Sequence, residues 1–207
     1  MIIHEIEQRT PEWFALRVKY PLTASKAQAI GNCGAGLDTL CWEKKAEEYR
    51  TSERVEIDNE HLQRGRELED QAIQRYTELY DTEVVPIGFV TDDKISKVGG
   101  VSPDGWTETH NIEVKCPADT KYFKLLAQYK AEGNITVESQ YMWQMQDQML
   151  FTGHTKSHYI VYNPNFEDDI IVIEVLEDKD MQDKIRAGLE KGEGILNEID
   201  QKLGTAF

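Results

Sequence analysis

Long apolar runs are missing from this chain of 207 residues, and none approaches the length of a membrane-spanning helix. Cysteine is scarce: Cys33, Cys41 and Cys116 are odd in number and scattered, which is typical of reduced thiols and leaves too few for a four-cysteine iron–sulfur cluster. The first residues, MIIHEIEQRT, lack the basic and then apolar pattern of a signal peptide. These absences, with 40% hydrophobic and 29% charged residues, favour a globular protein of the cytoplasm.

Basic residues are also in deficit. Lysine and arginine number 23 against 38 aspartates and glutamates, which gives a formal net charge of −15. DNA-binding proteins usually carry a basic surface, so the overall charge argues against a nucleic-acid partner. Binding depends on where the cations lie, however, and Arg9, Arg17, Lys19 and Lys26 gather near the start of the chain. We interpret the acidic stretch 167–183 as a solvated face.

The hydrophobic periodicity predicts helices and strands mixed along one domain. Thr10 and Pro11 form a helix start, with the threonine as N-cap and the proline at the first helical position. Helices are expected over 11–18, from Thr23 or Ser25 onward, and over 37–50, 59–80, 120–131, 137–151 and 179–203. Strands are expected over 83–91, 95–101, 157–162 and 170–175, with a hairpin between 99 and 117. The predicted fold class is α/β (mixed α+β), a small central mixed sheet flanked by helices.

The hairpin segment GGVSPDGWTETHNIEVKCP carries the clearest chemical signal. Side chains alternate along a strand, so Glu113 and Lys115 are expected on one face and Val114 on the other. The Pro-Asp-Gly sequence around Asp104 is turn chemistry, and pairing of the two arms would bring Asp104 beside Glu113. Mg²⁺ prefers oxygen ligands and usually takes one or two carboxylates. These residues therefore predict a metal-assisted site that cuts a phosphodiester, with a protonated Lys115 near the attacking water.

An ordinary surface hairpin with a solvated Glu–Lys pair would show the same residue types, so the motif by itself leaves both interpretations open. Two details favour the site. The charges of Glu113 and Lys115 lie between apolar residues, which indicates a strand inside the domain. Gly99 and Gly100 would let the backbone pass close to another group.

Four segments of the chain, in order, resemble the phage lambda-type alkaline exonucleases, a branch of the restriction-endonuclease-like PD-(D/E)XK nucleases. In that family the first segment, here EQRTPEWFALRVKYPLTASKA, contacts the 5′ end of DNA and its phosphate. Trp13, Arg17, Thr23 and Ser25 match the pattern, and an arginine fork with hydroxyl and N–H donors is phosphate-binding chemistry. Without the resemblance, Trp13 would be a core anchor, Ser25 a cap and Arg17 a surface cation.

The second segment, RGRELEDQA, matches a family helix whose acidic residue faces the metal. Glu69 is the better match and Glu67 the weaker one. The third segment is the hairpin, with SPDG and EVKCP close to the family form. The fourth, QYMWQMQDQML, places Gln144 at the family's active-site glutamine, with Gln140 and Gln148 on the same helical face.

The resemblance implies a restriction-endonuclease-like core and a Mg²⁺-dependent exonuclease that digests the 5′ strand of linear duplex DNA to mononucleotides. The 3′ overhangs left behind would serve recombination by strand annealing. Two Mg²⁺ per site are implied, with Mn²⁺ as a substitute. The implied catalytic residues are Asp104, Glu113, Lys115 and Gln144. The implied metal ligands are Asp104, Glu113, the backbone carbonyl of Val114, and Glu69. The implied DNA and 5′-phosphate contacts are Trp13, Arg17, Thr23 and Ser25.

Relatives form ring-shaped trimers threaded by DNA, so the resemblance also implies a homotrimer, a single-strand annealing protein as partner and no membrane association. It implies the cytoplasm of a bacterial or phage-infected cell. It divides the chain into an end-binding part (1–58), a nuclease core (59–176) and a closing helix (177–207). Two alternatives stay open: an endonuclease or structure-specific nuclease on the same fold, and a non-catalytic DNA- or protein-binding module.

Overall fold

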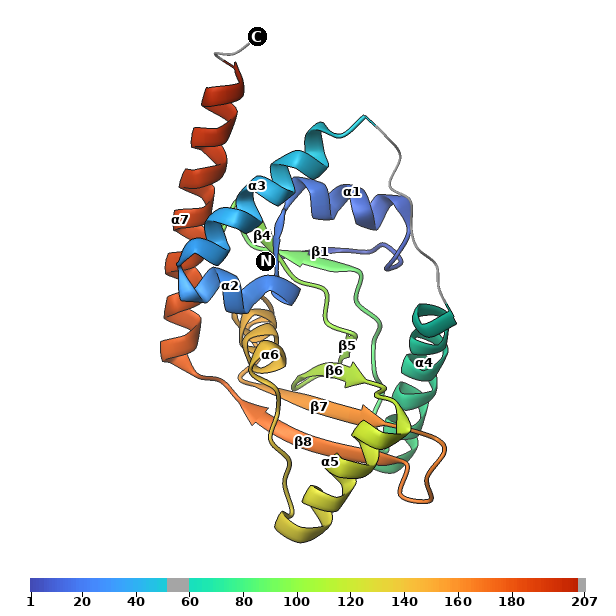
Figure 1. Ribbon diagram of the computed structural model, residues 1–207. Coiled ribbons are helices and arrows are strands. Elements are labelled where there is room, and N and C mark those ends of the chain that lie inside the picture. The colour runs from blue at the N-terminus through green and yellow to red at the C-terminus, as the bar shows by residue number, and fades with distance from the viewer. Residues whose placement is uncertain (52–59, 205–207) are drawn as a thin grey trace.

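A four-stranded mixed sheet forms the centre of the molecule (Figure 1). The structure is a computed structural model that describes residues 1–51 and 60–204, except for the side chains of residues 60–64 and 66. Strand β5 (Gly105–Trp106) pairs antiparallel with β6 (Asn111–Lys115), β6 pairs parallel with β7 (Lys156–Tyr162), and β7 pairs antiparallel with β8 (Ile170–Leu176). The predicted mixed sheet is therefore confirmed.

Helices cover both faces of this sheet, as predicted. Helix α4 (Glu60–Tyr80) packs one face, where Tyr76 joins Ile112 and Val114 in a buried cluster. Helices α5 (Asp119–Glu132) and α6 (Ser139–Thr152) cover the other face, where Met145 and Met149 pack against β7 and β8. Because successive side chains alternate, Glu113 points away from α4 and toward α6.

A second layer contains both ends of the described chain. Helices α2 (Ala27–Asn32) and α3 (Ala35–Tyr49) pack against the long α7 (Lys179–Gly204), and α1 (Pro11–Lys19) contacts α3. The 3-10 turn η1 (Ala24–Lys26) precedes α2 (Figure 1). The core here includes Leu22, Leu37 and Leu189. Helices α2 and α7 approach so closely that a Cβ at Gly188 would lie 2.0 Å from the carbonyl oxygen of Ile30.

The helix ends agree with the predicted ends to within a few residues. The hydroxyl of Thr10 accepts the backbone N–H of Trp13 at 3.3 Å, so the predicted N-cap of α1 is confirmed. The predicted start of a helix at 59 and the predicted boundary at 58 lie outside the described residues. Within the part of the chain that is described, no helix combines the length and apolar character needed to cross a bilayer.

Two predicted strands are much shorter than expected. Only β3 (Phe89–Thr91) forms within 83–91, and only β4 (Gly99–Gly100) within 95–101. Pro86 has no N–H to donate to a ladder. The chain then turns at Asp92, whose carbonyl accepts the N–H groups of Ile95 and Ser96.

Short strands from the N-terminal segment complete the pairing. Strand β1 (Ile2–His4), which the sequence did not predict, pairs with β3. Strand β2 (Leu22–Thr23) runs parallel to β4. Through these pairs the N-terminal segment is fastened to the chain that leads into the hairpin.

Candidate active site

Asp104 lies beside Glu113, as predicted, but the Pro-Asp-Gly sequence does not form the hairpin turn. Gly105 already pairs with Ile112 in β5, so Asp104 lies at the entry of that strand. The hairpin reverses after Trp106 instead, where the backbone N–H of Thr107 bonds to the carbonyl oxygen of His110. One carboxylate oxygen of Asp104 accepts the N–H of Val114 at 2.7 Å. Asp104 is therefore fastened directly to the strand that carries Glu113.

The Glu113 carboxylate is 0% exposed and is held by two glutamines of α6. The Gln144 amide donates to one of its oxygens at 2.8 Å, and the Gln148 amide donates to the other at 2.7 Å. A buried carboxylate is costly unless its oxygens are hydrogen-bonded. The glutamines therefore stabilise Glu113 in a single orientation. Gln140, on the same helical face, bonds to Glu138 instead.

Lys115 completes the cluster on the predicted face of β6. Its ammonium donates to Glu113 and, at 2.9 Å, to the carbonyl oxygen of Val114, and it lies 4.9 Å from the centre of the Tyr141 ring. Burial would lower the pKa of Lys115, but the charges of Glu113 and Asp104 outweigh burial and raise it above its ordinary value. Lys115 is therefore protonated at neutral pH, as expected from the sequence.

The pKa of the Asp104 carboxyl group is strongly shifted by its surroundings in this site. Burial and the neighbouring Glu113 charge raise the pKa of Asp104 well above its ordinary value of 3.8. Glu69 of α4 lines a hollow of about 720 Å³ together with Asp104, whereas Glu67 is exposed and lies outside that lining. Of the two glutamates considered from the sequence, Glu69 is the one near the carboxylate pair.

The donors present fit a hard divalent cation. Asp104 and Glu113 supply carboxylate oxygens, Val114 supplies a carbonyl oxygen, and Glu69 is close by, which is the donor type that Mg²⁺ takes. Among the described residues, no three His, Cys, Asp or Glu side chains are gathered into a complete ligand set. The Lys115 ammonium donates to the carboxylate of Glu113 and to the carbonyl oxygen of Val114. In this structure a cationic group therefore contacts two of the expected metal ligands.

The four residues predicted to bind a 5′ phosphate also lie together. The guanidinium of Arg17 stacks 4.4 Å from the Trp13 ring centre and donates to the hydroxyl of Thr23 at 3.1 Å. The Ser25 hydroxyl lies 3.5 Å from the same guanidinium and 3.4 Å from the Thr23 hydroxyl. A guanidinium fork beside two hydroxyl groups, one at the end of β2 and the other in η1, provides donors for an anion.

Trp13 connects the two clusters. Its indole N–H donates to the carbonyl oxygen of Gly88 at 3.1 Å and to the hydroxyl of Ser102 at 3.0 Å. Ser102 precedes Asp104 by two residues. Thr23 is paired with Gly100 in the β2–β4 register, so the same short segment holds both clusters.

Comparison with known proteins identifies the family of this chain. The model of the YqaJ-like viral recombinase domain matches residues 12–155, well over half of the chain. The chain belongs to the YqaJ-like viral recombinase family. The family predicted from the four segments is thereby confirmed. Among curated proteins, none matches this YqaJ-like chain.

Solved structures of exonucleases share the fold. The alkaline exonuclease LHK-Exo of Laribacter hongkongensis superposes with a TM-score of 0.77 at 24% identity, covering 96% of this chain and 100% of its own. Its complex with dAMP gives 0.78 at 25% identity over the same shares. A phage-related exonuclease from Haemophilus somnus 129PT gives 0.66 at 15% identity, covering 88% of this chain and 96% of its own. The YqaJ-like domain thus has the alkaline exonuclease fold.

Sequence reasoning missed three contributors to the cluster. Gln148 was visible only as a neighbour of Gln144 at helical spacing, yet it bonds to Glu113 as directly as Gln144 does. Tyr141 lies beside Lys115, and its position on the same helix was the available signal. Arg9 forms an ion pair with Glu69 at 2.6 Å, and no local pattern predicts that contact.

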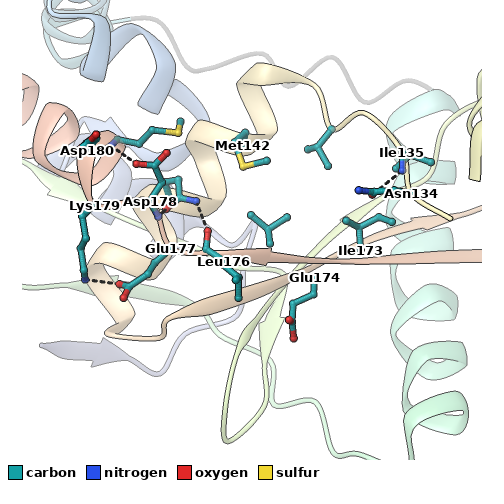
Figure 2. Close-up of a pocket in the computed structure, with 14 residues that line it drawn as sticks. Asn134, Ile135, Met142, Ile173, Glu174, Leu176, Glu177, Asp178, Lys179 and Asp180 are labelled. Carbon is teal, nitrogen blue, oxygen red and sulfur yellow. Dashed lines mark hydrogen bonds and ion pairs between the residues drawn. The ribbon is translucent and has the colours of Figure 1, made fainter. Parts of the chain in front are cut away.

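A separate hollow of about 770 Å³ lies between β8, the start of α7 and the segment before α6 (Figure 2). It contains none of the predicted site residues. Its polar groups serve local structure: Gln146 bonds to the carbonyl oxygen of Leu176 and to the N–H of Asp178, and the Asp178 carboxylate accepts the N–H of Met181. Lys179 pairs with Glu177 at its rim. These contacts join α6 to the end of β8 and to the start of α7.

Proposed function

We propose that this YqaJ-like protein is a metal-dependent exodeoxyribonuclease that digests the 5′ strand of linear duplex DNA. It would release mononucleotides and leave 3′ overhangs for strand annealing. One observation carries the proposal: the buried Glu113 carboxylate is held by two glutamines and faces Lys115, with Asp104 alongside, on the fold of the alkaline exonucleases. Burying charged groups costs free energy, and this cost supports a functional rather than a structural role for the group.

Asp104, Glu113 and the Val114 carbonyl are the proposed ligands of one Mg²⁺, and Glu69 is the proposed ligand of a second, with Mn²⁺ as a substitute. When bound, such ions lower the pKa of water and neutralise charge on the phosphate. Lys115 positions the attacking water and stabilises negative charge in the transition state. Gln144 supports catalysis by orienting Glu113, to which it donates at 2.8 Å.

Arg17, Ser25, Thr23 and Trp13 are proposed to hold the 5′ phosphate of the strand that is digested. The Arg17 guanidinium and the two hydroxyls provide donors, while the Trp13 ring supports the guanidinium from one side. The acidic chain binds DNA, on this proposal, through this local group of donors rather than through its net charge of −15.

The organisation of the chain and its partners follow the same proposal. The end-binding part is 1–58, the nuclease core 59–176 and the closing helix 177–207. Three copies would form a ring around duplex DNA in the cytoplasm of a bacterial or phage-infected cell, with a single-strand annealing protein as partner. A strictly monomeric mass in solution would contradict the ring.

The catalytic assignment is tested with Lys115→Ala on 5′-phosphorylated linear duplex in Mg²⁺. Loss of one electrostatic group from an active site costs about 100-fold or more in rate. The matched control is Lys124→Ala, because Lys124 is an exposed lysine of α5 and should retain the wild-type rate. Wild-type rates for Lys115→Ala would show that the assignment is wrong.

Polarity and end recognition are tested with duplexes labelled at either end, with and without the 5′ phosphate. The wild type should release label from the 5′ end and prefer the phosphorylated substrate. Arg17→Ala should narrow that preference while leaving Glu113 and Lys115 in place. Cleavage of covalently closed circular DNA would favour the endonuclease alternative instead.

A further inference from the structure

Arg9 has a backbone conformation that arginine rarely adopts. Its φ of 69° lies in the left-handed region, which costs free energy for any residue with a Cβ. Cys33 and Asp81 also have positive φ, but they follow the C-termini of α2 and α4, where a left-handed residue is common. Arg9 instead lies with Gln8 in a turn just before Thr10, the N-cap of α1.

Contacts on both sides of Arg9 fix this conformation. The Gln8 amide donates to the carbonyl oxygens of Ile87 at 2.6 Å and Pro103 at 2.9 Å. On the other side, the Thr10 hydroxyl donates to the carbonyl oxygen of Glu7 at 2.8 Å. Strained residues persist where the surroundings determine them in this way, and they concentrate at functional sites. Pro103 immediately precedes Asp104, so Arg9 is positioned relative to the carboxylate pair.

Arg9 lines the same hollow as Asp104 and Glu69. Its guanidinium lies 2.6 Å from a carboxylate oxygen of Glu69, with the arginine side chain 36% exposed and the glutamate 20% exposed. Glu69 is the carboxylate proposed to hold a second metal ion. A guanidinium bonded to a carboxylate lowers its attraction for a divalent cation and repels that cation directly.

We propose that Arg9 is a built-in cation of this site, which competes with the second divalent ion for Glu69. The inference rests on the proposed function, since it assumes a first ion at Asp104 and Glu113. It predicts two unequal metal affinities, with the weaker one set by Arg9. Arg9 acts on the metal through Glu69 and need not contact DNA.

The test is a Mn²⁺ titration followed by electron paramagnetic resonance, comparing wild type with Arg9→Gly in the absence of DNA. Glycine is chosen because it accepts a positive φ without strain. The second Mn²⁺ should bind about two- to fivefold more tightly to Arg9→Gly, since an ion pair of this exposure contributes a modest free energy. The first Mn²⁺ should bind both proteins alike.

Three controls distinguish a specific effect of Arg9 on Glu69 from a general change in charge or in stability. Lys97→Gln removes an exposed charge elsewhere and should leave the second affinity unchanged. Glu69→Gln should weaken the second site and abolish the difference between arginine and glycine at position 9. The thermal unfolding midpoint of Arg9→Gly in chelator should stay close to that of wild type, because relief of the positive φ offsets the loss of the exposed ion pair.

Superimposable second-site isotherms for wild type and Arg9→Gly would overturn this inference alone, provided that the first site is present and is lost in Glu113→Gln. Tightening of equal size in Lys97→Gln would also overturn it. Absence of any Mn²⁺ binding in all proteins would overturn the proposed metal chemistry and this inference together.

Discussion

Replacing Asp147 by asparagine should stabilise the protein at alkaline pH and change its stability little at acidic pH. Asp147 is 0% exposed, and among the described residues neither of its carboxylate oxygens has a hydrogen-bond partner. It lies on the face of α6 that also carries Trp143 and Phe151, which pack with α2 and α7. Burial raises the pKa of Asp147 from 3.8 to about 8.

The sign follows from the protons that each state binds. Between pH 4 and pH 8 the folded protein keeps a proton on Asp147 that the unfolded chain releases. The stability of the acidic form is therefore fully present below pH 3.8 and is lost as the pH rises through about 8. About four pH units at ~1.4 kcal/mol each give a loss on the order of 5 kcal/mol. That is a large part of the roughly 5–15 kcal/mol available to a domain.

The assay is urea unfolding of wild type and Asp147→Asn at pH 5 and at pH 8.5. The gain in unfolding free energy for Asp147→Asn should be several kcal/mol larger at pH 8.5 than at pH 5. Asp183→Asn, which removes an exposed aspartate of α7, is the control for the change in net charge. An equal difference between wild type and Asp147→Asn at both pH values would refute the reasoning.

Four further outcomes are expected. Gly188→Ala should lower the unfolding free energy by about 2 kcal/mol, because its Cβ would meet a backbone oxygen of α2 at 2.0 Å. Gly194→Ala on the same helix has no described atom within 4 Å of the new Cβ and should stabilise by about 0.5–1 kcal/mol in the same urea assay. Trp13→Phe keeps the ring but loses two hydrogen bonds, so thermal unfolding should report a loss of about 1–2 kcal/mol. Mn²⁺ at ~100 times its dissociation constant should stabilise wild type by ~2.7 kcal/mol, and Glu113→Gln or added chelator should remove that gain.

The sequence predicted the helices and the central sheet because their signals are local. Thr10 and Pro11 mark the start of α1 by residue type, and the alternation around Glu113 marks β6. Strands β1, β2 and β4 have only two or three residues each. Such short strands depend on partners far away in the chain, for example Thr23 on Gly100, and no local pattern contains that information.

The candidate site also combines contacts that the sequence predicts locally with contacts that depend on distant parts of the chain. Glu113 and Lys115 are two residues apart on one strand, so their common face follows from the pleat. The bonds of Gln148 to Glu113 and of Arg9 to Glu69 depend on how elements pack across the molecule. The left-handed backbone of Arg9 was also invisible, because the residue type that usually signals such a conformation is glycine.

The close contact between α2 and α7 has a consequence for synthesis of the chain on the ribosome. Residues near Ile30 emerge early, but their packing partner around Gly188 emerges on the order of ten seconds later at typical translation rates. Until then the apolar faces of α2 and α3 have no cover from α7. The nascent protein can therefore assemble its central sheet before its N-terminal layer.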